Sequence, residues 1–135
     1  IVVWGAPASG KTTYVRKHME PGDLVVDLDL IKQGISMTGK TEAPDSLLDT
    51  AINIREHIYG LIERREVSCS TAWVVAGLPE AQERERLAGR LGAELVHIEA
   101  TEAQCIARAR ADDERGDKGQ QERIIRRWFK QFYYE

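Results

Sequence analysis

The sequence has few of the residues that cross-link a small protein or anchor it in a membrane. The 135-residue chain contains two isolated cysteines, Cys69 and Cys105, and three scattered histidines. This pattern excludes a disulfide framework and the close Cys/His spacing of a zinc site, and it suits a reducing compartment. No apolar run approaches the ~18 residues of a membrane span, and we expect no signal peptide. We therefore expect a cytoplasmic protein without a membrane partner.

A surplus of one charge is also lacking, because 19 Lys and Arg stand against 22 Asp and Glu, for a net charge of −3. No global field then draws the chain to nucleic acid or to a membrane, and any such contact must be local. Hydrophobic residues make up 42% of the chain, without internal repeats or linkers, which is enough for one core. We expect a single domain over residues 1–135, as a monomer or a weak oligomer. Since the chain begins at Ile1 and not at a methionine, we expect that a few native residues have been removed.

The most informative stretch that is present is GAPASGKTT, directly behind the apolar run IVVW. It fits G-x-x-x-x-G-K-[ST], the pattern of a phosphate-binding loop, and it has a strand pattern before it and a helix pattern after it, as that motif requires. Glycine allows the positive φ and the close approach by which backbone N–H groups surround a polyphosphate. A chance glycine-rich turn is the weaker alternative. The residues expected to bind the nucleotide are Gly5, Ala6, Pro7, Ala8, Ser9, Gly10, Lys11, Thr12 and Thr13.

The chemistry of such a loop assigns two side chains. Lys11 would reach the β- and γ-phosphates of ATP, and the hydroxyl of Thr12 would ligate Mg²⁺. The helix that begins near Lys11 adds the positive end of its dipole. We therefore expect ATP and Mg²⁺ as ligands.

Strand and helix patterns alternate along the whole chain. This alternation predicts an α/β fold, a four- to five-stranded parallel sheet with helices on both faces and ligands at the carboxyl ends of the strands. The third strand is almost wholly apolar, which is typical of a central position. The expected strands are 1–4, 23–29, 71–77 and 94–100, and the expected helices are 11–20, 46–66, 80–92, 102–115 and 120–134.

Two helices carry an apolar stripe that indicates a core-facing side. In the helix over 46–66 the stripe consists of Leu47, Leu48, Ala51, Ile58, Leu61 and Ile62. In the last helix it consists of Ile124, Ile125, Trp128, Phe129 and Phe132. Gly92 is expected to end the helix over 80–92, and Thr101 with Gln104 forms a capping-box pattern for the next one.

The second strand ends in acids, in the sequence VVDLDLIK. If the strand persists, Asp27 and Asp29 are alternate residues whose side chains point the same way, beside the phosphate loop. One carboxylate could accept the proton of an attacking hydroxyl while the other holds the Mg²⁺ shell. A pair of solvated or helix-capping aspartates is the alternative. Lys32, three residues on, could hold a phosphate of the acceptor or could be a surface lysine.

The stretches GAPASGKTTYVRKHM and LVVDLDLIKQGI together resemble the small P-loop kinases, most closely the 5′-kinase domain of phage-type polynucleotide kinases. That family has a similar G-x-P-x-S-G-K-[ST]-T loop, and then an acid-rich strand end with a basic residue three positions beyond the catalytic aspartate. The resemblance runs in order over nearly the whole chain. It implies a three-layer P-loop NTPase fold with a short arginine-bearing lid, and a bacterial or phage-infected host cytoplasm.

The resemblance also implies roles for single residues. Asp29 takes the place of the general base, with Asp27 in the metal shell, and Lys32 takes the place of an acceptor-phosphate arginine. The lid would span about 108–119, in RARADDERGDKG, with Arg110 and Arg115 over the triphosphate and Arg108 behind them. The alternative for this segment is a solvated helix end whose arginines pair with Asp112, Asp113 and Glu114 as weak surface salt bridges.

Two features depart from the pattern of that family. Lys32 replaces an arginine, and lysine cannot form the same bidentate contact with a phosphate. The third strand ends in Ala76-Gly77, where the polynucleotide kinases have an acid-containing segment. This strand end also lacks the acid with which AAA+ motors hydrolyse ATP, which counts against a motor.

We expect an ATP-dependent kinase that moves the γ-phosphoryl group of ATP to a hydroxyl. A polynucleotide 5′-hydroxyl, at a DNA or RNA end, is the first choice of acceptor, and a nucleoside, nucleotide or small metabolite is the second. An ATPase or a nucleotide-gated module that binds DNA or protein is the alternative from another class.

Overall fold

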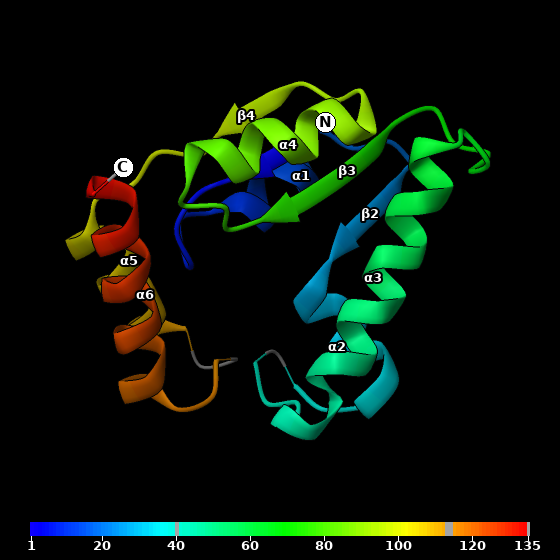
Figure 1. The fold of residues 1–135 in the computed structure, drawn as a ribbon. Helices are drawn as coiled ribbons and strands as arrows, with labels where there is room; N and C mark the ends of the chain where they lie inside the picture. Colours follow the sequence, from blue (N-terminus) through cyan, green and yellow to red (C-terminus); the bar gives the residue numbers. More distant parts are fainter. Residues whose placement is uncertain (40, 113–114, 135) are drawn as a thin grey trace.

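The computed structural model describes residues 1–39, 41–112 and 115–134, and it contains one parallel sheet in the order β2-β3-β1-β4 (Figure 1). The strands are β1 Val2–Trp4, β2 Leu24–Asp27, β3 Ala72–Ala76 and β4 Leu95–His97. The apolar strand β3 lies in the interior of the sheet, between β2 and β1, as its composition predicts. The predicted α/β class with a parallel sheet is confirmed.

Helices cover both faces of this sheet, as predicted. They are α1 Lys11–His18, α2 Leu28–Ser36, α3 Leu48–Glu63, α4 Ala81–Leu91, α5 Glu102–Ala111 and α6 Lys118–Tyr133, with a short 3₁₀ turn at Asp45–Leu47 before α3. No helix within the three described ranges is both long and apolar enough to cross a membrane.

Alternate residues of the strands build two separate cores, because side chains of a strand point to opposite faces in turn. One core joins the sheet to α3 and α4, and its members are Val2, Val26, Tyr59, Ile62, Val74 and Leu91. The core on the other face joins the sheet to α1, and its members are Val3, Val15, Trp73 and Val75. The sheet is therefore held firmly between α1 on one face and α3 with α4 on the other.

A third core fixes α5 and α6 beside the end of β1. Its buried members are Trp4, Ala6, Cys105, Ile106, Ala109, Ile125, Trp128 and Phe129. The predicted stripe on the last helix is thus buried at Ile125, Trp128 and Phe129, and Phe132 packs against the same core. Because Ala6 belongs to this core, α5 lies directly beside the glycine-rich loop.

The structure corrects the predicted second strand. β2 ends at Asp27, and residues 28–36 form α2, which the sequence patterns did not indicate. Asp27 is the N-cap of α2, and its Oδ1 accepts a hydrogen bond of 2.8 Å from the backbone N–H of Asp29. A capping aspartate satisfies a free N–H at a helix start, which turns the chain from strand to helix. Asp27 and Asp29 are therefore not alternate residues of one strand.

The predicted helix over 46–66 is shorter, and its apolar stripe is confirmed in part, since Ala51 and Ile62 are buried and Ile58 packs against the core that contains Ile62. α3 buries Ala51, Tyr59 and Ile62, whereas Leu48 at its start is 38% exposed. Tyr59, which is also buried, was not in the predicted stripe. The two predicted helix caps are confirmed: Gly92 ends α4 in a left-handed conformation, and Thr101 with Gln104 forms the capping box of α5.

The helices α2 and α3 lie on one side of the molecule and α5 and α6 on the other, with the carboxyl ends of the strands between them (Figure 1). Away from the sheet, the two sides also meet where the backbone N–H of Gly116 donates to Thr41 Oγ1 at 2.8 Å. The space between the two sides is thus bounded by the sheet at one end and by these loops at the other.

Candidate active site

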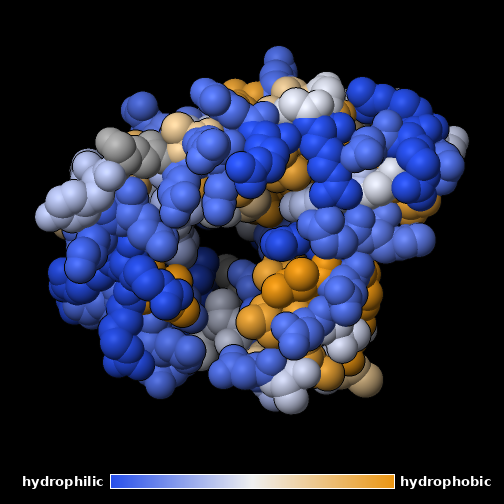
Figure 2. All heavy atoms as spheres, viewed as in Figure 1, coloured by the Kyte–Doolittle hydropathy of each residue, from blue (hydrophilic) through white to orange (hydrophobic). Residues whose placement is uncertain are grey.

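A cleft of about 1140 Å³ lies at the carboxyl ends of the strands. Figure 2 shows it as a hollow through the centre of this face of the molecule, with apolar side chains on one wall. Its lining comes from the glycine-rich loop and α1, from the start of α2, from α3, from the end of β3, and from α5 with the loop that follows. The cleft therefore lies at the carboxyl ends of the parallel strands, which is where ligands were expected.

The glycines of the loop are required by its conformation. A Cβ on Gly5 would lie 2.7 Å from the backbone oxygen of Ile98, which is closer than real Cβ atoms approach. Gly10, the N-cap of α1, has φ 105°, which other residues rarely adopt. Among the described residues no side chain caps the start of α1, so its first N–H groups are open toward the cleft. This arrangement suits a phosphate group.

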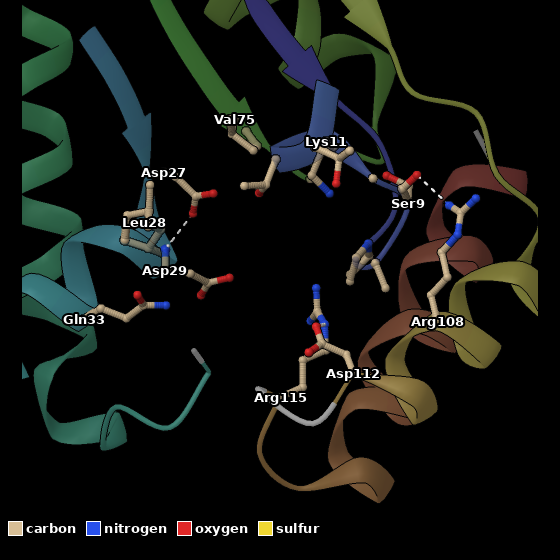
Figure 3. Close-up of a pocket in the computed structure, with 18 of the residues that line it drawn as sticks. Ser9, Lys11, Asp27, Leu28, Asp29, Gln33, Val75, Arg108, Asp112 and Arg115 are labelled. Atoms are coloured by element: carbon tan, nitrogen blue, oxygen red, sulfur yellow. Dashed lines mark hydrogen bonds and ion pairs between the residues drawn. The ribbon is translucent and has the colours of Figure 1, made fainter. Parts of the chain in front are cut away.

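Lys11 lies at the centre of the site (Figure 3). Its ammonium group donates to the backbone oxygens of Gly5 and Ala6, at 2.8 and 2.7 Å. Burial, which disfavours the charged form, lowers the pKa of Lys11 to about 8, and the nearby carboxylate of Asp27 opposes this shift. A buried ammonium with a lowered pKa gains much from a polyanionic ligand.

Asp27 and Asp29 both line the cleft on the side of α2 (Figure 3). Asp27 is the more buried of the two, and burial, followed by the charge of Asp29, raises the pKa of its carboxyl group. Asp29 is in the first turn of α2 with its side chain 48% exposed. The two carboxylates are thus brought together, by a helix cap in place of strand alternation.

The oxygen groups around Lys11 fit Mg²⁺ better than a softer metal. Thr12 and Asp27 line the same part of the cleft, and a hydroxyl with one carboxylate is typical of Mg²⁺ bound together with nucleotide phosphates. Within the described part of the chain, no group of three or more His, Cys, Asp or Glu side chains could hold a metal by itself. When bound here, Mg²⁺ would supply charge neutralisation to the phosphates.

Lys32 does not line the cleft. Its ammonium group lies 3.4 Å from Asp29 Oδ1, in an i,i+3 pair on α2. Lys32 is therefore paired with the predicted base and does not face the cleft in which an acceptor would bind. This placement gives no support to Lys32 as the acceptor-phosphate residue.

Of the three arginines in the predicted lid, two line the cleft. Arg108 of α5 donates to the backbone oxygen of Ser9 at 2.8 Å (Figure 3). Arg115 donates to Gln121 Oε1 at 2.8 Å and lies 3.4 Å from Asp112 Oδ2, with a side chain that is only 14% exposed. Two guanidinium groups therefore face the glycine-rich loop from the α5–α6 side.

Arg110 is not brought to the cleft. Its guanidinium group pairs with Glu122 of α6 at 2.7 Å, and its side chain is 62% exposed. Arg108 and Arg110 are two residues apart on one helix, about 200° around its axis, so both cannot face the loop. Asp113 and Glu114, which the alternative interpretation pairs with these arginines, lie outside the described residues. Arg108 therefore faces the glycine-rich loop, where Arg110 was predicted.

Sequence reasoning missed two polar residues of the α2–α3 wall, Gln33 and Arg55. Gln33 lies on the helix that was not predicted, so no pattern pointed to it. In the sequence, Arg55 looks like any charged residue of an amphipathic helix. Its place beside the cleft becomes apparent in the folded chain. The acid that the family pattern has after the third strand is replaced by Val75, Ala76 and Gly77, which line the cleft without a carboxylate.

A family model described as an AAA domain matches residues 1–133, so the chain belongs to this family. No curated protein matches the sequence. The family and the loop geometry define a nucleotide-binding P-loop protein of the kinase and ATPase class. The finer resemblance to phage-type polynucleotide kinases remains a prediction.

Proposed function

We propose that this chain is an ATP-dependent kinase that transfers the γ-phosphoryl group of ATP to a hydroxyl group. The glycine-rich loop and Lys11 hold the triphosphate, and Asp29 accepts the proton of the attacking hydroxyl. Arg108 and Arg115 lie over the phosphates from the other side, where they stabilise the charge of the transferring group. Thr12 and Asp27 hold Mg²⁺. Positioning and electrostatics supply nearly all of the catalysis in reactions of this type.

The observation that carries this proposal is the arrangement of charge around one cleft. Lys11 stands at its centre, the carboxylates of Asp27 and Asp29 lie toward α2, and the guanidinium groups of Arg108 and Arg115 lie toward α5 (Figure 3). A base on one side of a phosphate site and cations on the other suit in-line transfer to an acceptor. The end of β3 offers no carboxylate to activate water, which favours transfer over hydrolysis.

The hydroxyl acceptor belongs to one of two classes. A polynucleotide 5′-hydroxyl is the first choice, because the loop and the acid-rich segment resemble the phage-type kinases. A nucleoside, nucleotide or small metabolite is the second. One observation favours the second class: Lys32, the counterpart of the acceptor-phosphate arginine, does not line the cleft.

A transfer screen with γ-labelled ATP tests the proposal. The acceptors are DNA ends, RNA ends, nucleosides, nucleotides and small alcohols, each with Mg²⁺. We expect label on at least one acceptor and little free labelled phosphate. Label that appears only as inorganic phosphate with every acceptor would mark the chain as an ATPase.

Replacement of either cleft arginine is expected to slow transfer strongly. Arg108→Ala and Arg115→Ala should each lower kcat by about 10³-fold, the usual contribution of an arginine that contacts the transferring phosphoryl group. Arg110→Ala is the matched control on the same helix, since its guanidinium pairs with Glu122 outside the cleft. Steady-state kinetics and thermal melting of the three variants measure this. Equal kcat values for Arg108→Ala and Arg110→Ala would show that α5 contributes no catalytic arginine.

ATP affinity is expected to fall above about pH 8. In the free protein the pKa of Lys11 is lowered to about 8, so the ammonium loses its proton as the pH rises through that value. Bound phosphates favour the charged form and raise this pKa, so binding takes up a proton in alkaline solution. The affinity should then decrease by up to ~10-fold per pH unit above 8. Titration calorimetry in two buffers with different ionisation heats measures the proton uptake, and its absence near pH 9 would contradict the assignment.

A further inference from the structure

Arg55 of α3 is a cleft residue to which the proposed mechanism gives no role. It lines the cleft on the α2–α3 wall, and its Nε is buried without a hydrogen-bond partner among the described residues. A buried donor of a charged group that is left unsatisfied is costly and rare in folded proteins. The arrangement is explained if Arg55 meets a ligand group in the filled cleft.

Two arginines lie near the same aromatic ring, and they differ in their partners. The guanidinium groups of Arg55 and Arg90 lie 5.6 and 5.7 Å from the centroid of the Tyr59 ring. Arg90 has carboxylate partners, because it forms 2.9 Å ion pairs with both Glu56 and Glu63. Arg55 forms no ion pair with a described residue. Of the two, Arg55 is the one that lines the cleft, and its charge has no carboxylate partner among the described residues.

The place of Arg55 in the cleft indicates which ligand it meets. The triphosphate is assigned to the loop and α1, with Arg108 and Arg115 on the α5–α6 side, whereas Arg55 lies on the opposite wall with Leu28, Leu30 and Gln33. That wall also carries Asp29, the proposed base, so it is the side on which the acceptor must lie. A planar guanidinium matches the paired oxygens of a carboxylate or a phosphate.

We infer that Arg55 binds an anionic group of the acceptor, a phosphoryl or a carboxylate group, and so selects acceptors that carry one beside the hydroxyl to be phosphorylated. This inference rests on the proposed kinase function. It assigns to α3 the anion contact that Lys32, paired with Asp29, does not supply. The leucines of the same wall would pack against the uncharged part of such an acceptor.

Calorimetric titrations with matched probes test this directly, because they need no transfer. Adenosine 3′-monophosphate is compared with adenosine, and glycerate with glycerol, in the presence of Mg²⁺ and a non-hydrolysable ATP analogue. The wild-type chain should bind at least one anionic probe more tightly than its neutral partner, and the preferred pair identifies the anion as phosphoryl or carboxylate. Arg55→Gln should lower the affinity for that probe by ~10–100-fold, as expected for the loss of a charged hydrogen-bonded pair. The affinities for the neutral probe and for the ATP analogue should not change.

Two further variants separate a binding role from a packing role. Arg55→Lys keeps the positive charge but loses the planar guanidinium that binds two oxygens at once. It should lower the affinity for the anionic probe by less than Arg55→Gln does. Arg90→Gln removes the other arginine of the Tyr59 ring and should lower the melting temperature without changing probe affinity. If no anionic probe is preferred by the wild type, or if Arg55→Gln binds it normally, the inference is overturned.

The failure of the kinase proposal would look different. If label from ATP passes only to water while Arg55 still governs anion binding, the anion site stands and the kinase function falls. If transfer occurs and its KM for an anionic acceptor is the same in Arg55→Gln, the kinase function stands and the role of Arg55 falls.

Discussion

Lys11→Ala is expected to abolish phosphoryl transfer, with a loss of at least ~10²-fold, and to weaken ATP binding, while the fold remains intact. Among the described residues of the cleft lining Lys11 is the only lysine, and its ammonium group donates to two backbone oxygens of its own loop. Its removal breaks these two hydrogen bonds and also relieves the burial of a charge. Calorimetry with ATP and Mg²⁺, with thermal melting beside it, measures both effects.

Lys17→Ala is the matched control for this substitution. Lys17 lies on the same helix, α1, but it is exposed and does not line the cleft. It should leave ATP affinity and turnover unchanged. Normal ATP affinity and turnover in Lys11→Ala would remove the phosphate-loop assignment itself.

Asp29→Asn is expected to lower kcat by ~10²–10⁴-fold, the usual span for the loss of a general base, with ATP affinity near that of the wild type. The amide keeps the size of the side chain but cannot accept the proton of the acceptor hydroxyl. Asp27→Asn should instead change the Mg²⁺ concentration that activity requires. It should leave the start of α2 intact, because the Oδ1 of asparagine can accept the same capping hydrogen bond.

Asp49→Asn is the control for the pair, since Asp49 is an exposed carboxylate in the first turn of α3 and does not line the cleft. Its kinetics and Mg²⁺ dependence should match the wild type. If Asp29→Asn transfers phosphate at the normal rate, the proton acceptor is another group, and the role carried over from the kinase resemblance fails.

The phosphate loop could be predicted from the sequence because its determinants are local. Two glycines, a lysine and a threonine at fixed spacing specify the backbone path, and the structure adds only why Gly5 admits no side chain. The succession of strands and helices along the chain, apart from α2, followed from apolar runs that alternate with amphipathic helices. The buried stripe of α6 could also be predicted, since it repeats over three turns of one helix.

The details of the cleft could not be predicted, because they depend on competition between local signals or on distant contacts. The sequence after Val26 continues an apolar alternation that suits a strand, but the Asp27 cap starts a helix at Leu28 that this pattern does not indicate. The choice between Arg108 and Arg110 depends on which side of α5 faces the loop. Among the described residues Arg90 has two carboxylate partners and Arg55 has none, and this contrast appears when α3 and α4 pack together.

The ratio of free phosphate to ADP tests the central claim most directly. A single reaction with ATP, Mg²⁺ and an acceptor that takes up label in the screen is stopped at several times, and both products are counted. Transfer to a hydroxyl in this cleft predicts that ADP exceeds free phosphate at every time, with the difference recovered on the acceptor. Equal amounts of ADP and free phosphate, unchanged by any acceptor, would show that the chain passes the phosphoryl group to water and would contradict the account.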